Sequence, residues 1–192
     1  MSRRTHLSLA APGALLVLAL MAAAMPVTAL GKTDVKACQK DGYRNYTDTS
    51  GQRFATQADC SAYVRKGNAL SFDLLEVTPQ PANEGDVVVG NTNPAPVSVT
   101  LTNVGSISAQ SLQVGGVESD PLHSFNFDLA NVDVGGCFEL APGQSCVWTV
   151  ALSPTDAGPA AARIIAVYSA PDGRSGTEFI DVTANGVAPP PS

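Results

Sequence analysis

The chain has 192 residues, with 17 acidic against 11 basic residues, a net charge of −6 and four cysteines. This length suffices for one good hydrophobic core with a small appendage, and the acidic balance argues against nucleic acid as a partner. It holds two histidines, and His6 lies in the N-terminal segment, so chemistry that needs a histidine base could use only His123.

The N-terminal segment is typical of a secretory signal peptide. Arg3 and Arg4 precede an uncharged run from 7 to 25, and residues 27–29 offer small or slender side chains to a signal peptidase. An uncleaved anchor is the alternative, but the run is near the lower limit for crossing a bilayer. General secretion is favoured over the twin-arginine route. We predict a cleavable signal peptide over residues 1–29, a periplasmic or extracellular product, and no membrane attachment after cleavage.

Charge divides the rest of the chain into two parts. Residues 30–71 carry seven basic and four acidic residues, a net charge of +3. Residues 72–192 carry two basic and thirteen acidic residues, a net charge of −11. We predict a small basic unit over 30–71, a larger domain over 72–187 and a Pro-rich tail over 188–192.

Within the basic unit, the residues after Phe54 are predicted as a short helix. Thr56 can cap this helix, with Asp59 three residues on, and Gly67 can end it. The segment before it sets aromatic residues between Asp-Gly and Ser-Gly turns, which predicts a small hairpin. So short a unit buries little apolar area, and a disulfide worth on the order of 3 kcal/mol is the expected staple.

Four cysteines in an exported chain predict two disulfides. Three pairings are possible, and the neighbour pairing is favoured because each pair brackets its own local unit: Cys38 with Cys60, and Cys137 with Cys146. A zinc site would need shorter spacings or adjacent histidines, and a redox dithiol would need two cysteines with two residues between them. Neither pattern occurs in the sequence.

The pattern C-x3-G-[W/Y]-x2-[F/Y]…F…C-x2-[Y/W]-V runs from Cys38 to Val64. It is similar to a small two-cysteine segment that recurs in secreted bacterial proteins, usually with Trp where Tyr43 stands here. That segment has no assigned function, so the resemblance implies none for this chain.

Residues 72–187 are predicted to consist of strands and turns. Residues 97–103 show the pattern, because Val97, Val99 and Leu101 alternate with serine and threonine. Seven or eight short strands with turn signals between them predict an all-β sandwich. The predicted strands are 72–77, 97–103, 111–117, 124–130, 147–153, 162–170 and 178–184.

Four stretches of this region carry a resemblance: LTNVGSISAQSLQVGGV, SFNF, CFELAPGQSC-x-W-x-V-x-L-x-P-x3-G and VTANGV. Together they resemble the Ig-like domains of the ASH type (abnormal spindle/Hydin-like), which in bacterial secreted proteins are labelled choice-of-anchor D domains. Leu152-Ser153 before Pro154 departs from the usual V-x-F-x-P. The resemblance implies an Ig-like β-sandwich that serves as a structural or interaction module without catalytic residues. It also implies that Cys137 and Cys146 lie at the base of a hairpin with residues 141–144 at its tip.

Candidate catalytic and metal-binding residues are few. His123 is interpreted as a structural histidine in a loop, and Glu118 as a solvated charge. The aspartates 120, 128 and 133 lack the spacing of a calcium loop. Trp148 alternates with Val150 and Leu152, which favours a core position over a ligand-stacking role. We therefore predict a protein that is not an enzyme and that uses no cofactor or metal.

The basic unit offers one candidate binding surface. Its cations and rings could hold an anionic wall polymer or an acidic glycan by charge and stacking. Alternatively, the rings form the core of the unit and the cations solvate it or lean on the acidic sandwich. The residues are Lys40, Tyr43, Arg44, Tyr46, Arg53 and Arg65.

Two functions remain open on the sequence. The first is a secreted, non-catalytic structural or protein-interaction module whose protein or cell-envelope partner is not identified. The alternative is an envelope adhesion or glycan-binding protein that works through the basic unit.

Overall fold

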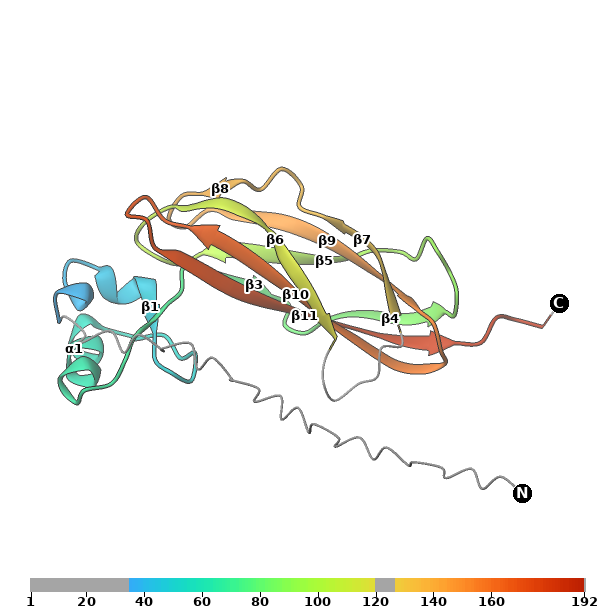
Figure 1. Cartoon of the computed structure of the whole chain (residues 1–192), viewed down its shortest axis with the longest axis horizontal. Helices are drawn as coiled ribbons and strands as arrows, with labels where there is room; N and C mark the ends of the chain where they lie inside the picture. Colours follow the sequence, from blue (N-terminus) through green and yellow to red (C-terminus); the bar gives the residue numbers. More distant parts are fainter. Residues whose placement is uncertain (1–34, 120–126, 192) are drawn as a thin grey trace, which may run out of the picture. The chain divides into compact units, whose positions relative to one another are not determined.

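The computed structural model describes residues 35–119 and 127–191 (Figure 1). The predicted signal peptide and His123 lie outside these residues. Residues 32–192 belong to one compact unit. Within the described ranges, no helix has both the length and the apolar character needed to cross a membrane.

Strands make up most of the described chain, as Figure 1 shows. The strands of the two large sheets are β3 (Leu75–Thr78), β4 (Ala82–Val88), β5 (Val97–Asn103), β6 (Ala109–Ser119), β7 (Phe127–Asp133), β8 (Glu139–Leu140), β9 (Ser145–Pro154), β10 (Gly158–Ser169) and β11 (Ser175–Val187).

These strands form two sheets packed as a sandwich, which confirms the predicted fold class. The five-stranded sheet has the order β4-β11-β10-β6-β8, and the four-stranded sheet has the order β3-β5-β9-β7. β4 pairs with β11 in parallel, whereas β10 pairs antiparallel with both of its neighbours. The sandwich thus has Ig-like antiparallel sheets with one parallel edge strand.

The core lies between the two sheets. In β5, Val99 and Leu101 are fully buried, while Thr100 and Thr102 on the other face are only half-buried. In β9, Trp148 is 0% exposed, so the predicted core position of this ring is confirmed. Burying each large apolar side chain contributes about 1.5–3 kcal/mol, and this drives the two faces together.

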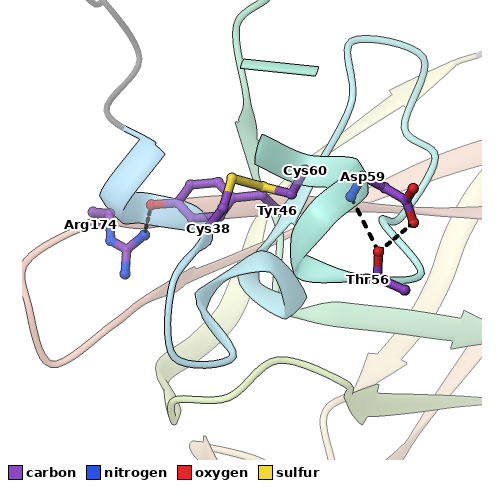
Figure 2. The surroundings of a disulfide bond; sticks show 6 residues. All are labelled: Cys38, Tyr46, Thr56, Asp59, Cys60 and Arg174. Atoms are coloured by element: carbon purple, nitrogen blue, oxygen red, sulfur yellow. Dashed lines mark hydrogen bonds between the residues drawn. A yellow bond between two sulfur atoms is a disulfide. The ribbon is translucent and has the colours of Figure 1, made fainter. Parts of the chain in front are cut away.

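Residues 35–71 contain the predicted helix. α1 spans Gln57–Arg65, and the Thr56 hydroxyl accepts a hydrogen bond from the Asp59 N–H at 3.2 Å (Figure 2). Gly67 follows the helix with a left-handed backbone, φ 84°, and its N–H donates to the carbonyl of Val64. The helix therefore begins and ends as the capping residues predict.

The predicted hairpin is present in a reduced form. An antiparallel bridge joins Thr47 to Arg53 across a tight turn, and β1 (Tyr46–Thr47) pairs with β2 (Ser71–Phe72). The residues before β1 form two short 3-10 turns, Val35–Cys38 and Gly42–Asn45. The Cys38–Cys60 disulfide, drawn in Figure 2, ties the first of these turns to α1.

The second disulfide, Cys137–Cys146, is also present, but the segment between its cysteines is not a hairpin. β8 pairs with β6 in the five-stranded sheet, whereas β9 pairs with β5 and β7 in the four-stranded sheet. The turn at 141–144 therefore carries the chain from one sheet to the other. The expectation of a hairpin was wrong because a Pro-Gly turn fixes only a local reversal, not the partner of each strand. The disulfide links the loop before β8 to the start of β9.

Replacing both Cys137 and Cys146 by serine is expected to lower the free energy of unfolding by about 2 kcal/mol, because the loop they close is short. The sandwich should stay folded, since both sheets keep their other pairings. Chemical denaturation followed by near-UV circular dichroism checks this. Loss of the near-UV signal in the absence of denaturant would show that the link is needed for folding.

Candidate interaction surface

The six predicted binding residues do not form one surface. Tyr43 packs against the buried cluster of Cys38, Cys60 and Val64, so its ring belongs to the core of the small unit. The side chains of Lys40, Arg44 and Arg65 are exposed. Arg53 and Tyr46 instead contact residues outside the small unit.

Arg53 is held by the first strand of the sandwich. Its guanidinium forms an ion pair with Asp73 at 3.0 Å and donates to the carbonyl oxygens of Asp73, at 3.0 Å, and Leu75, at 2.5 Å. Only 29% of the Arg53 side chain and 20% of the Asp73 side chain are exposed. Arg53 therefore occupies backbone acceptors at the start of β3 and has little surface left for a ligand.

The hydroxyl of Tyr46 is hydrogen-bonded to Arg174, which lies between β10 and β11. The Arg174 guanidinium donates to the Tyr46 hydroxyl, as Figure 2 shows, and lies 4.2 Å from the centroid of the Phe72 ring. Asp172 accepts two hydrogen bonds from the same guanidinium. Burial raises the pKa of the Tyr46 hydroxyl, so it stays protonated at neutral pH.

Asn45 provides a further contact that the sequence did not single out. It is 4% exposed, and its Oδ1 accepts hydrogen bonds from the Ser106 N–H at 2.6 Å and from the Ser106 hydroxyl. Gly105 directly precedes Ser106, and a side chain there would collide with Leu74 and Asn45. The only sequence signal for this contact was Gly105, and a glycine by itself does not indicate that Asn45 would pack beside it.

A cluster of ionisable groups surrounds these contacts. The Tyr168 hydroxyl accepts a hydrogen bond from the Leu74 N–H at 2.7 Å, and burial raises its pKa. Burial, together with the charges of Asp73 and Glu76 and against that of Arg53, raises the pKa of Glu178 to about 8. Glu178 thus binds a proton in the folded chain at pH values where it is ionised in the unfolded chain.

We expect Glu178→Gln to stabilise the protein increasingly as the pH rises from about 4.5 to about 8. Because the pKa of Glu178 is raised on folding, its contribution to stability is fully present below about pH 4.5 and is lost as the pH rises to about 8. Because the side chain is partly exposed, the full effect is reduced: the free energy of unfolding of the variant should exceed that of the wild type by about 2 kcal/mol near pH 9 and equal it near pH 5. Urea denaturation at both pH values measures this, with Glu139→Gln as the control. Equal effects of Glu178→Gln at both pH values would contradict it.

The exposed large apolar side chains form a second set of candidates. Among the described residues, all of them lie on the sandwich and none lies in residues 35–71. They are Val88 (36% exposed), Val117 (39%), Phe138 (66%), Val147 (48%) and Phe179 (44%).

The carboxylates considered for metal binding are not brought together. Within 35–119 and 127–191, no group of three or more histidine, cysteine or acidic residues is placed to hold a metal ion. Glu118 and Asp133 are exposed, as solvated charges would be. Asp120 and the side chain of Asp128 lie outside the described part of the chain.

No known protein family profile and no curated protein matches this chain. Solved structures resemble it in fold. The VesB protease of Vibrio cholerae has 18% sequence identity and a TM-score of 0.41, over 72% of this chain and 39% of that one. The ASH/PapD-like domain of human CEP192 has 8% identity and a TM-score of 0.40, over 60% and 87% of the two chains.

The periplasmic chaperone SfaE has 9% identity and a TM-score of 0.40, over 61% of this chain and 59% of its own. The matched region spans well under half of the length of VesB. At these identities the likeness concerns the Ig-like fold alone.

Proposed function

We propose that this chain is an exported, non-catalytic protein-interaction module. In this proposal residues 1–29 direct export, residues 30–71 form a small basic unit, and residues 72–187 form an ASH-type Ig-like sandwich that binds the partner. The observation that carries it is the location of the exposed large apolar side chains, all of which lie on the sandwich within the described residues.

Exposed apolar and aromatic side chains favour a protein as the partner. Aromatic residues such as Phe138 and Phe179 are enriched at protein interfaces, where burial of a few such anchors supplies most of the affinity. Phe138 is 66% exposed although it directly follows Cys137, which the disulfide holds in the core. A rigidly placed anchor of this kind loses little conformational freedom on binding.

The ASH-type assignment is supported by the roles of the residues that carry the resemblance. Asn103 and Gly105 of the LTNVGS stretch both take part in buried contacts. The Gly143 N–H of the LAPGQSC turn donates to the Asn103 carbonyl at 2.7 Å. The LTNVGS stretch and the LAPGQSC turn are thus in contact, as expected if both belong to the sequence pattern of one fold.

Binding of an anionic polymer through the basic unit is the second candidate. Lys40, Arg44 and Arg65 are exposed and could attract it. The hollow that Arg53 lines, of about 220 Å³, also contains Asp48 and Asp59, which would repel an anion. Residues 72–192 carry a net charge of −11 and would repel it as well.

Capture from the envelope of the producing organism tests the proposal. Chain that begins at residue 30 is immobilised, and the bound material is analysed for protein and for glycan. We expect a protein that is also captured by a variant with Lys40→Gln, Arg44→Gln and Arg65→Gln, but not after Phe138→Ser. Capture of glycan alone, or loss of all binding in the triple variant, would favour the second candidate and contradict the proposal.

A further inference from the structure

β6 extends well beyond its edge partner β8. The two strands pair only at Ala109 with Leu140 and at Gln110 with Glu139. One more hydrogen bond on this side runs from the Leu112 N–H to the Phe138 carbonyl. Beyond Leu112, the only strand that pairs with β6 in the described chain is β10.

Exposure of β6 changes at the same point. Leu112 is fully buried, but each position from 113 to 118 is exposed or half-buried. Val117 is 39% exposed although it lies opposite Ile164 of β10, which is fully buried. The apolar side chain of Val117 therefore marks a place where the core side of the sheet is uncovered at its edge.

Two other sheet edges carry features that discourage the addition of a strand. Arg53 donates to carbonyl oxygens at the start of β3, and Pro79 follows the end of that strand. At the other end of the five-stranded sheet, β4 carries Glu84, whose carboxylate accepts the Leu152 N–H at 2.9 Å. Such capping, proline and charge prevent unwanted strand pairing. In β6, two adjacent glycines, 115 and 116, leave the backbone without side-chain cover.

The outward face beside this edge has a defined chemistry. Pairing places Gly116 of β6 in one row with Ile165 and Phe179, and Glu118 in the next outward row with Arg163 and Asp181. The β6–β10 pairing skips Gly115, so this pattern holds from Gly116 onward. A strand added beside β6 would find apolar surface next to Gly116 and a carboxylate two residues further.

We propose that β6 accepts an extended segment of the partner protein as an additional strand, along residues 113–118. The segment carries an apolar side chain opposite Gly116, a second apolar side chain over Val117, and a lysine or arginine opposite Glu118. Backbone hydrogen bonds supply the affinity of strand addition, and the alternate side chains supply its specificity. This inference rests on the proposed function, because it identifies where the sandwich binds its partner and which sequence pattern it selects.

A designed peptide tests the edge without knowledge of the partner. The probe is threonine–lysine–valine–leucine–valine–lysine–threonine, which reads the same in both directions, so that strand polarity does not matter. It is titrated as a fluorescent conjugate into the chain that begins at residue 30. One control peptide carries glutamate in place of both lysines, and another carries proline in place of the central leucine. We expect both controls to bind at least about tenfold more weakly than the probe.

Variants locate the binding. Val117→Lys places an inward-facing charge on the edge, and Glu118→Lys reverses the charge of the outward row; each should weaken probe binding about tenfold or more. The matched controls are Ser98→Lys, at an exposed serine of β5, and Glu139→Lys, at an exposed glutamate of β8; both variants should bind the probe as the wild type does. Far-UV circular dichroism verifies that all four variants fold.

Equal binding by the three peptides, or equal effects of the test and control variants, would overturn the proposal. So would slow exchange in the free chain of those amides in 113–118 that do not bond to β10, because the outer edge would then already be paired within the chain itself. If the captured envelope protein binds the Val117→Lys and Glu118→Lys variants normally, the edge assignment fails and the interaction function stands. If no protein is captured at all, the function itself fails.

Discussion

Replacing Asn103 by leucine is expected to lower the free energy of unfolding by about 4 kcal/mol. Asn103 is 0% exposed, and its Nδ2 donates to the carbonyl oxygens of Ile107, at 2.8 Å, and Leu140, at 2.7 Å. Its Oδ1 accepts from the Gly105 N–H at 2.9 Å. Leucine has a similar volume but removes all three hydrogen bonds; the Gly105 N–H keeps only a longer bond to the Leu74 carbonyl, at 3.3 Å, and each buried backbone group left without a partner costs about 1–3 kcal/mol.

The Asn103 side chain matters more than a single hydrogen bond because it joins segments distant in sequence. It connects the end of β5 to β8, and its backbone groups bond the turn at 141–144. Asn185→Leu, at an exposed asparagine of β11, is the matched control and should change stability by less than about 0.5 kcal/mol. Thermal and urea denaturation measure both variants. An Asn103→Leu protein within about 1 kcal/mol of the wild type would refute this role.

Arg53→Met is expected to lower the free energy of unfolding by about 3 kcal/mol at neutral pH. The substitution keeps most of the side-chain volume but leaves the Asp73 carboxylate largely buried without its ion-pair partner. The carbonyl oxygens of Asp73 and Leu75 also lose a donor. Burial already raises the pKa of Asp73, so the loss should shrink at acid pH, where this carboxylate is protonated.

A double-mutant cycle with Asp73→Asn separates the ion pair from the loss of packing. The two substitutions should be strongly non-additive, because Asp73→Asn removes the buried charge that Arg53→Met leaves unpaired. Arg44→Met changes an exposed arginine of the same unit and should have little effect. Additive effects of Arg53→Met and Asp73→Asn would mean that Arg53 acts through its carbonyl contacts alone.

Local sequence signals predicted those helices and strands whose conformation is determined by residues near them in the sequence. The two ends of α1 were predicted correctly from Thr56, Asp59 and Gly67, because helix capping depends on residues close in sequence. The alternation in 97–103 predicted β5 with its observed bounds, since one of its faces is buried.

β4 and β8 were not predicted, for identifiable reasons. β4 contains Asn83, Glu84 and Asp86 with a left-handed Gly85, φ 78°, so its pattern is that of a turn. It is nevertheless a strand, because parallel pairing with β11 satisfies its backbone. β8 has only two residues, too few for any alternation to be visible.

The candidate surface shows the same limit. Charge and aromatic content singled out Arg53 and Tyr46 as available for a ligand, because sequence does not reveal that Asp73 and Arg174 occupy them. The exposure of Phe138 and the excess length of β6 depend on strand pairing across long separations, which no local pattern encodes.

Amide hydrogen exchange of the chain from residue 30 onward, with and without the captured envelope protein, tests the central claim most directly. Because a bound strand protects the backbone that it pairs with, we predict slower exchange at 113–118 and no change in residues 35–71. Protection confined to residues 35–71, with β6 unaffected, would show that the basic unit is the binding surface.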